Sequence, residues 1–177
     1  GGIVRWIAGY DHQTSIARQV ITENEWPEIR ILVCVVNDHR KDTSSTFGMQ
    51  LSCQTSPLIK YRAEHVVLEH CDQITKAIME RNFEKFAEIT MKDSNQFHAI
   101  CQDTYPPIRY MNDISWSIVN LIHFINNLFG YNVACYTFDA GPNACIYCLD
   151  NNVPILIKSI RRMFQKSDGT ELAINGI

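Results

Sequence analysis

The spacing of apolar residues predicts two groups of strands in this chain. Residues 29–37 form an almost continuous apolar run, which is typical of a strand in the middle of a sheet. Residues 133–138 and 144–149 form a second pair of apolar segments, separated by the turn residues Gly141, Pro142 and Asn143. Residues 108–111 are predicted as a short strand, and residues 170–177 can add an edge strand.

Between these strands, apolar residues recur at intervals of three and four, which predicts amphipathic helices. Residues 57–81 form one long helix, and residues 112–130 form another that Asn112 caps and Gly130 ends. Asn82 is predicted to cap a second helix. Asp93, with Gln96 three residues on, resembles a capping box that opens a third. Asn152 is predicted to cap the last helix.

The order of these elements predicts an α+β fold of ferredoxin-like type, with an antiparallel sheet and helices packed on one face. The chain has 177 residues, which suits one ordinary domain. It opens directly in a strand without an initiator methionine. We therefore expect residues 1–25 to be the remnant of a truncated N-terminal domain, and residues 26–177 to form a C-terminal domain.

Composition narrows the function classes. The formal charge of −3 argues against a nucleic-acid partner. The longest apolar run, residues 31–36, is too short to span a bilayer. The seven cysteines are odd in number and lie in apolar segments, which suits reduced thiols in a cytoplasmic protein. Cys145 and Cys148 have the spacing of a zinc pair, but residues three apart on a strand face opposite sides, so no metal site is predicted.

Two segments carry candidate chemistry. Asp139 stands where a strand meets a turn, which is a common place for binding and catalytic groups, although aspartate also caps turns for local reasons. Ser45 and Thr46, followed by Gly48, offer hydroxyls and close backbone access that can hold a phosphate. A hydrophilic loop without any ligand is the competing interpretation of that segment.

Four motifs carry a resemblance to a known family. They are Ser44-Ser45-Thr46-Phe47-Gly48-Met49, Thr90-Met91-Lys92-Asp93-Ser94-Asn95-Gln96-Phe97-His98-Ala99, Asp103-Thr104-Tyr105-Pro106-Pro107, and Tyr136-Thr137-Phe138-Asp139-Ala140-Gly141-Pro142-Asn143-Ala144. Together they resemble the diphosphomevalonate decarboxylases, relatives of galactokinase, homoserine kinase, mevalonate kinase and phosphomevalonate kinase. The resemblance covers essentially the whole chain and corresponds to the C-terminal portion of the family's catalytic chain.

The resemblance implies an ATP-dependent reaction that converts mevalonate 5-diphosphate to isopentenyl diphosphate, in isoprenoid and sterol precursor synthesis. It implies that Asp139 is the catalytic aspartate, that Ser45 and Thr46 bind the substrate diphosphate, and that Gly48 lets the backbone approach the substrate. We expect ATP and Mg²⁺ to be bound mainly by an N-terminal part that precedes this chain. A homodimer is expected as well, with no membrane partner, and this chain alone is expected to be inactive.

Other interpretations stay open. The domain can be a non-catalytic module for dimerisation or metabolite binding, or part of a related kinase that phosphorylates the same hydroxyl without decarboxylation. Asp93, Ser94, Asn95 and His98 match a family motif too, but a helix cap and a packed histidine explain them without a catalytic role.

Overall fold

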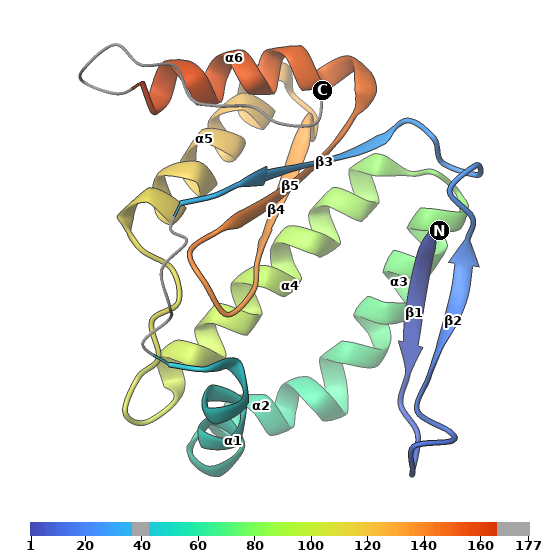
Figure 1. Cartoon of the computed structure of the whole chain (residues 1–177), viewed down its shortest axis with the longest axis vertical. Coiled ribbons are helices and arrows are strands. Elements are labelled where there is room, and N and C mark those ends of the chain that lie inside the picture. Colours follow the sequence, from blue (N-terminus) through green and yellow to red (C-terminus); the bar gives the residue numbers. More distant parts are fainter. Residues whose placement is uncertain (37–42, 166–177) are drawn as a thin grey trace.

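The fold is an α+β arrangement in which a small antiparallel sheet packs among long helices (Figure 1). The computed structural model describes residues 1–36 and 43–165. The sheet has the order β3-β5-β4, formed by Ile29–Cys34, Ala144–Leu149 and Ala134–Phe138. The predicted α+β class and antiparallel pairing are confirmed. The edge strand predicted for residues 170–177 lies outside the described residues.

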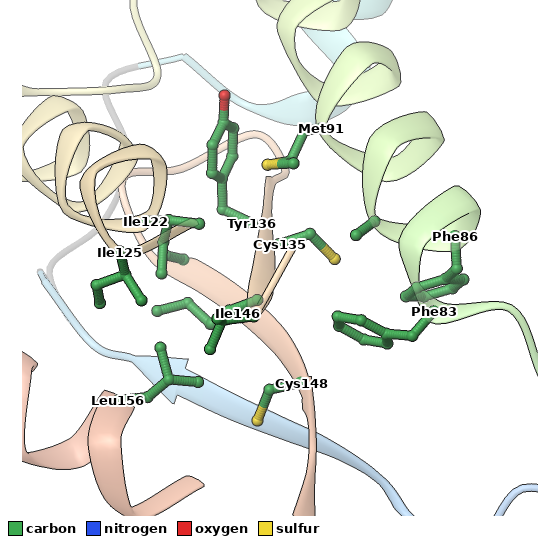
Figure 2. Packing of buried hydrophobic residues seen from close by; sticks show 14 of the residues in the cluster. Phe83, Phe86, Met91, Ile122, Ile125, Cys135, Tyr136, Ile146, Cys148 and Leu156 are labelled. Carbon is green, nitrogen blue, oxygen red and sulfur yellow. The ribbon is translucent and has the colours of Figure 1, made fainter. Parts of the chain in front are cut away.

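Helices reach the sheet from both sides, whereas we expected them on one face. Cys135 pairs with Tyr147 and Tyr136 with Ile146, so these two pairs lie on opposite faces. Tyr147 packs edge-on against Phe86 of α4 (Phe83–Asp103) at a centroid distance of 5.5 Å. The fully buried Ile146 shares a cluster with side chains of α5 (Asp113–Phe129) and α6 (Val153–Met163). Figure 2 shows Ile122 and Ile125 of α5 and Leu156 of α6 on the side of the strands opposite Phe83 and Phe86 of α4.

The outer edge of β4 is covered by side chains. Asn126 of α5, which is buried, donates from Nδ2 to the Ala134 carbonyl at 2.9 Å. Its Oδ1 accepts from the backbone N–H groups of Val133 and Ala134. An amide side chain thus supplies the hydrogen bonds that a neighbouring strand would make, which keeps this edge from pairing with another chain.

A separate hairpin precedes the sheet. Strands β1 (Ile3–Ile7) and β2 (Ile16–Ile21) pair antiparallel and lie beside α3 (Val67–Met79) (Figure 1). Arg5 contacts Asp72 of α3 at 2.6 Å. Trp26, which follows the hairpin and is 4% exposed, packs edge-on against Phe83 and Phe86 of α4. The first 25 residues therefore share the packing of the rest of the described chain.

The helices differ from the prediction near the middle of the chain. Ser45–Thr55 forms helix α1, where we expected a loop, and Ser44 caps it by accepting from the Phe47 N–H at 3.2 Å. The predicted helix over residues 57–81 consists of α2 (Pro57–Tyr61), a π-helical turn (Arg62–Val66) and α3. The sequence of α1 is rich in hydroxyl residues, contains a glycine and has no clear apolar face, so its apolar spacing does not predict a helix.

Helix α4 runs unbroken past Asp93, so the predicted third helix is wrong. Asp93 is not a cap, because its carboxylate binds Arg62 and His70 instead. Residues 108–111 do not form a strand either. The Ile108 N–H donates to the Cys101 carbonyl at 2.9 Å, which folds this segment back on the end of α4.

The caps predicted from single residues are confirmed at two helices. Asn82 accepts from the Lys85 N–H at the start of α4, and Asn112 forms a capping box with Ser115 at the start of α5. Gly130 ends α5 in the left-handed conformation, with φ of 75°. At α6 the helix follows a 3₁₀ turn over Asp150–Asn152. The Asn152 side chain does not cap it but donates to the Val133 carbonyl.

All seven cysteines lie in the described residues and are free thiols. Burial raises the pKa of Cys34, Cys101 and Cys148 to about 11 and that of Cys135 to about 12. Cys53 of α1 is the exposed member of the seven. Among the described residues, no helix combines the length and apolar character that crossing a bilayer would require.

Candidate active site

A cavity of about 430 Å³ opens between α1, the π-helical turn, α4 and the segment after β4. Ser45 and Gly48 line it from α1, and Asp139 lines it from the end of β4. Most of the remaining wall is apolar and is made by Met49, Ile59, Val67, Phe97 and Ile100. The cavity therefore places the Asp139 carboxylate and the Ser45 hydroxyl in a largely apolar surrounding. A second serine in its wall, Ser52, has its hydroxyl bonded to that of Thr104.

Asp139 directly follows β4 and is exposed. The tight turn after it is closed by the Gly141 N–H, which donates to the Asp139 main-chain carbonyl at 2.8 Å and not to the carboxylate. Within residues 1–36 and 43–165, no ion-pair partner contacts the carboxylate. The hydrogen bond that closes this turn therefore uses the Asp139 backbone and not its side chain, and no described residue forms an ion pair with the carboxylate.

The turn that carries Asp139 is fastened at its other residues. Ser115 donates from its hydroxyl to the Pro142 carbonyl at 2.8 Å. The Val36 N–H donates to the Asn143 side chain at 2.8 Å. Because α5 and the end of the β3 segment both hold this turn, the backbone around Asp139 is set by the fold and not by the turn alone.

Helix α4 contacts the residue just before Asp139. The Phe138 N–H donates to the Ser94 hydroxyl at 3.1 Å, and His98 Nε2 lies 3.3 Å from the Phe138 carbonyl. Burial lowers the pKa of His98, although the bond to Phe138 and the negative charge of Asp139 act in the opposite direction. The imidazole is therefore neutral at pH 7.

The N-terminus of α1 faces the same cavity. Ser45 and Thr46 are both exposed in the first helical turn, where backbone N–H groups lack partners within the helix. Such a terminus favours anions through its free N–H groups and the helix dipole. Ser45 lines the cavity, whereas Thr46 lies outside its wall.

Gly48 permits a close approach, but of a protein side chain. A Cβ at this position would lie 2.3 Å from the Tyr110 hydroxyl. That hydroxyl donates to the Ser44 carbonyl at 3.3 Å and so ties the start of α1 to the segment after α4. The structure shows that Gly48 makes room for Tyr110. That Gly48 also lets the backbone approach a substrate stays a prediction.

The opposite wall of the cavity is held by a charged cluster. Arg62 binds both Asp93 carboxylate oxygens, at 2.7 and 2.9 Å, and Gln96 Oε1 at 2.6 Å. His70 Nδ1 lies 3.0 Å from Asp93. Burial would raise the pKa of Asp93, but the hydrogen bonds from Arg62 and His70 outweigh it and the net pKa is lowered. The guanidinium that lines the cavity is thus already occupied on one side.

The described residues contain no group of three His, Cys, Asp or Glu side chains that could hold a metal ion. A Mg²⁺ ion that travels with a nucleotide needs only one or two protein carboxylates, because phosphates and water complete its shell. Asp139 is the one carboxylate in the described cavity wall, so the described residues do not form a Mg²⁺ site by themselves.

The fold therefore brings Asp139 together with Ser45 and Gly48. Asp139 is at least 91 residues from either of them in the sequence. Sequence reasoning missed Tyr110 and Arg62 as part of the site, since neither carries a local pattern. Ser94 and His98 were singled out by their motif but were interpreted as parts of a cap and a packed core. Their bonds to Phe138 are the signal that only the structure supplies.

Comparison with known proteins identifies the family of this chain. Residues 31–177 match the family model described as the mevalonate 5-diphosphate decarboxylase C-terminal domain. Diphosphomevalonate decarboxylase of Danio rerio is 48% identical and that of Homo sapiens 46%, each over 179 positions that cover 100% of this chain. The chain spans about 45% of the length of these relatives.

Solved structures show the same likeness. A mevalonate 5-diphosphate decarboxylase crystal structure superposes with a TM-score of 0.84 at 46% identity, covering 89% of this chain and 40% of the other. The Trypanosoma brucei enzyme gives 0.79 at 38% identity, covering 81% of this chain and 38% of the other. A complex described as MDDEF with MVAPP, AMPPCP and magnesium gives 0.81 at 26% identity, covering 94% of this chain and 50% of the other. The chain belongs to the family of mevalonate 5-diphosphate decarboxylase C-terminal domains.

Proposed function

We propose that this domain supplies part of the active site of an ATP-dependent decarboxylase that converts mevalonate 5-diphosphate to isopentenyl diphosphate. The observation that carries the proposal is the shared cavity. It exposes the Asp139 carboxylate, which has no ion-pair partner among the described residues, and Ser45 at the start of α1 to the same space of about 430 Å³. A domain kept only for dimerisation or scaffolding needs neither group in a cavity.

Asp139 is the group that acts on the reacting carbon. Its carboxylate orients the tertiary hydroxyl and accepts its proton as phosphoryl transfer proceeds. A carboxylate is a weak base for an alcohol, so positioning with late proton transfer is favoured over a preformed alkoxide. When the carbon later becomes electron-deficient, the same negative charge stabilises it.

The start of α1 holds the far end of the substrate. The Ser45 and Thr46 hydroxyls and the unpaired backbone N–H groups of the first turn donate to the diphosphate. Gly48 and Tyr110 keep this turn in place through the Ser44 carbonyl. Binding energy gained at the diphosphate is thereby converted into orientation at the hydroxyl.

ATP supplies the phosphoryl group that turns the hydroxyl into a leaving group, and Mg²⁺ accompanies it. We assign no ATP phosphate contact to the described residues, since they contain no glycine-rich phosphate loop. The part of the relatives that this chain does not span is the proposed location of most nucleotide contacts. This domain contributes the acceptor side of the reaction.

The test is the substitution Asp139→Asn in the full-length protein, meaning this domain joined to the part that the relatives carry in addition. Loss of the carboxylate is expected to lower kcat by about 10²–10⁴-fold, with folding unchanged. Asp113→Asn, at an exposed aspartate of α5, is the matched control. A wild-type kcat in Asp139→Asn would remove Asp139 from the mechanism.

A related kinase is the second candidate, because orienting a hydroxyl for phosphorylation requires the same carboxylate. Release of carbon dioxide in step with ADP separates the two activities. Formation of a stable phosphorylated product without carbon dioxide would favour the kinase.

We also infer a cytoplasmic homodimer. The seven free cysteines support the cytoplasmic location. Exposed apolar side chains on α5 support the dimer: Trp116, Phe124 and Leu128 are 52%, 65% and 70% exposed. Light scattering of the full-length protein measures the mass directly, and a monomer at micromolar concentration would contradict the dimer.

A further inference from the structure

The backbone immediately before Asp139 is held on both of its hydrogen-bonding groups by α4. The Phe138 N–H donates to Ser94 Oγ at 3.1 Å. The Phe138 carbonyl lies 3.3 Å from His98 Nε2, and because a carbonyl only accepts, Nε2 donates. The N–H and C=O of one strand residue point to the same edge, so a single helix face clamps this residue.

Ser94 bonds to the backbone of β4, whereas the side chain of its helical neighbour Thr90 bonds to the Phe86 carbonyl and to the Cys135 thiol. Hydroxyl side chains inside helices commonly bond to a carbonyl four residues back, and Thr90 does so with Phe86 at 2.7 Å. Ser94, one turn further along α4 and 4% exposed, instead contacts Phe138 across 44 residues of sequence. Losing its hydroxyl would leave the Phe138 N–H without a partner in a buried place.

His98 adds a donor without adding a charge. Its ring packs edge-on against Phe97 and Phe138, at centroid distances of 5.0 and 6.2 Å. In this apolar surrounding the neutral form is favoured, so the ring beside Asp139 does not form an ion pair with it. His98 thus fixes the backbone before Asp139 without neutralising the carboxylate.

A third contact extends the clamp along the strand. The Tyr136 hydroxyl donates to Asn95 Oδ1 at 3.0 Å and lies 3.1 Å from His123 Nε2 of α5. Figure 2 shows Tyr136 extending away from the strand between α4 and α5. Residues of α4 thus hold β4 at Tyr136 and at Phe138, which both precede Asp139 in the sequence.

We propose that Ser94 and His98 are positioning residues for Asp139, which fix the Phe138 peptide groups and thereby the direction of the carboxylate. The proposal rests on the proposed function of Asp139 and extends it to two residues that do not reach the cavity wall. A displacement of about 1 Å in a catalytic group can lower the rate about 100-fold. Contacts that fix the residue next to Asp139 can therefore have a large effect on kcat.

The test compares four variants of the full-length protein. Ser94→Ala and His98→Leu are expected to lower kcat by about 10- to 100-fold while KM for mevalonate 5-diphosphate stays within about twofold, because the diphosphate contacts lie on α1. His98→Gln keeps an N–H donor at similar reach and is expected to recover most of the rate. Thr90→Val removes a buried hydroxyl of the same helix that bonds to the Phe86 carbonyl and the Cys135 thiol but leaves the Phe138 bonds intact, and it is the control, with a wild-type kcat.

Thermal unfolding of each variant separates rate from folding. If Ser94→Ala and His98→Leu lose no more rate than Thr90→Val, or if His98→Gln is as slow as His98→Leu, the positioning role is overturned. Asp139→Asn distinguishes the two levels. If Asp139→Asn is inactive but Ser94→Ala has the wild-type rate, only the positioning role is overturned. If Asp139→Asn has the wild-type rate, both the proposed function and this inference are overturned.

Discussion

Ser45 and Thr46 are neighbours in the sequence, yet the structure gives them different surroundings. Both are exposed in the first turn of α1, but Ser45 lines the cavity and Thr46 lies outside its wall. A hydrogen bond to a charged group contributes about 1.5–3 kcal/mol, and 1.4 kcal/mol corresponds to tenfold in affinity. The two hydroxyls are therefore not expected to contribute equally to diphosphate binding.

We predict that Ser45→Ala in the full-length protein raises KM for mevalonate 5-diphosphate about tenfold, with a smaller rise for Thr46→Val and little change of kcat in either. Steady-state kinetics measure both. Cys53→Ala, at an exposed position of the same helix, is the control. Unchanged KM in both variants would take the start of α1 out of the substrate site.

Gly48 and Tyr110 can be tested as a pair. A Cβ at position 48 would lie 2.3 Å from the Tyr110 hydroxyl, and the ring cannot swing out because Tyr110 is 9% exposed. We predict that Gly48→Ala lowers the free energy of unfolding by about 1–3 kcal/mol, since the clash outweighs the helix propensity that alanine gains.

Removing the hydroxyl is expected to relieve most of this penalty. In the Tyr110→Phe background the atoms nearest to the added Cβ are Ile108 Cδ1 at 3.3 Å and the ring carbon Cζ at 3.4 Å, so only small side-chain shifts are needed. There Gly48→Ala is expected to be close to neutral, because the propensity gain of about 1 kcal/mol offsets these contacts. Urea unfolding of the four proteins gives the cycle. Equal effects of Gly48→Ala in both backgrounds would contradict the contact.

Whole elements were predicted best where one residue determines a boundary. Asn82, Asn112 and Gly130 mark helix ends through local chemistry, so the sequence alone places them. Asp93 has the same local signature as a cap, but its actual partner is Arg62, which is 31 residues away. The contact of Gly48 with Tyr110 spans 62 residues in the same way. Contacts of this kind depend on how α1, α2 and α4 pack, which no local pattern encodes.

The packing of α4 against the π-helical turn gives a prediction for acid stability. The carboxylate of Asp93 has a lowered pKa, so its stabilising effect is present above the ordinary value of 3.8 and is lost as the pH falls through the folded value. Asp93→Asn is expected to lower the urea midpoint at pH 7. It is also expected to flatten the loss of stability below about pH 4, where the wild-type carboxylate becomes protonated.

Glu88→Gln is the matched control for this experiment. Hydrogen bonds from Lys92 and Lys85 lower the pKa of Glu88 to about 2. The Glu88 side chain and both lysines are exposed to water, however, and exposed pairs contribute little. We expect its acid profile to follow the wild type. A larger effect of Glu88→Gln than of Asp93→Asn would contradict this ranking.

The charges of the described residues support the proposal that this domain does not carry out the reaction alone. Among the described residues, Arg62 is the cation that lines the cavity, and Asp93 and Gln96 already bind it. The chain carries a formal charge of −3, so it does not concentrate anions such as ATP or a diphosphate. We therefore propose that further positive charge at the site comes from outside the described residues.

We therefore predict that the purified 177-residue chain releases neither carbon dioxide nor ADP from mevalonate 5-diphosphate and ATP. A coupled assay for ADP, run beside the full-length protein at equal concentration, measures this. Circular dichroism must first show that the chain is folded. Turnover by the folded chain would show that this domain holds a complete site.

The cysteines have a practical consequence for following these events. Alkylating reagents attack the thiolate, and thiols with a pKa near 11 or 12 are almost fully protonated at pH 7. Cys53 projects to solvent from the helix whose first turn carries Ser45. A maleimide fluorophore should therefore attach there first, giving a spectroscopic reporter for ligand capture without any engineered cysteine.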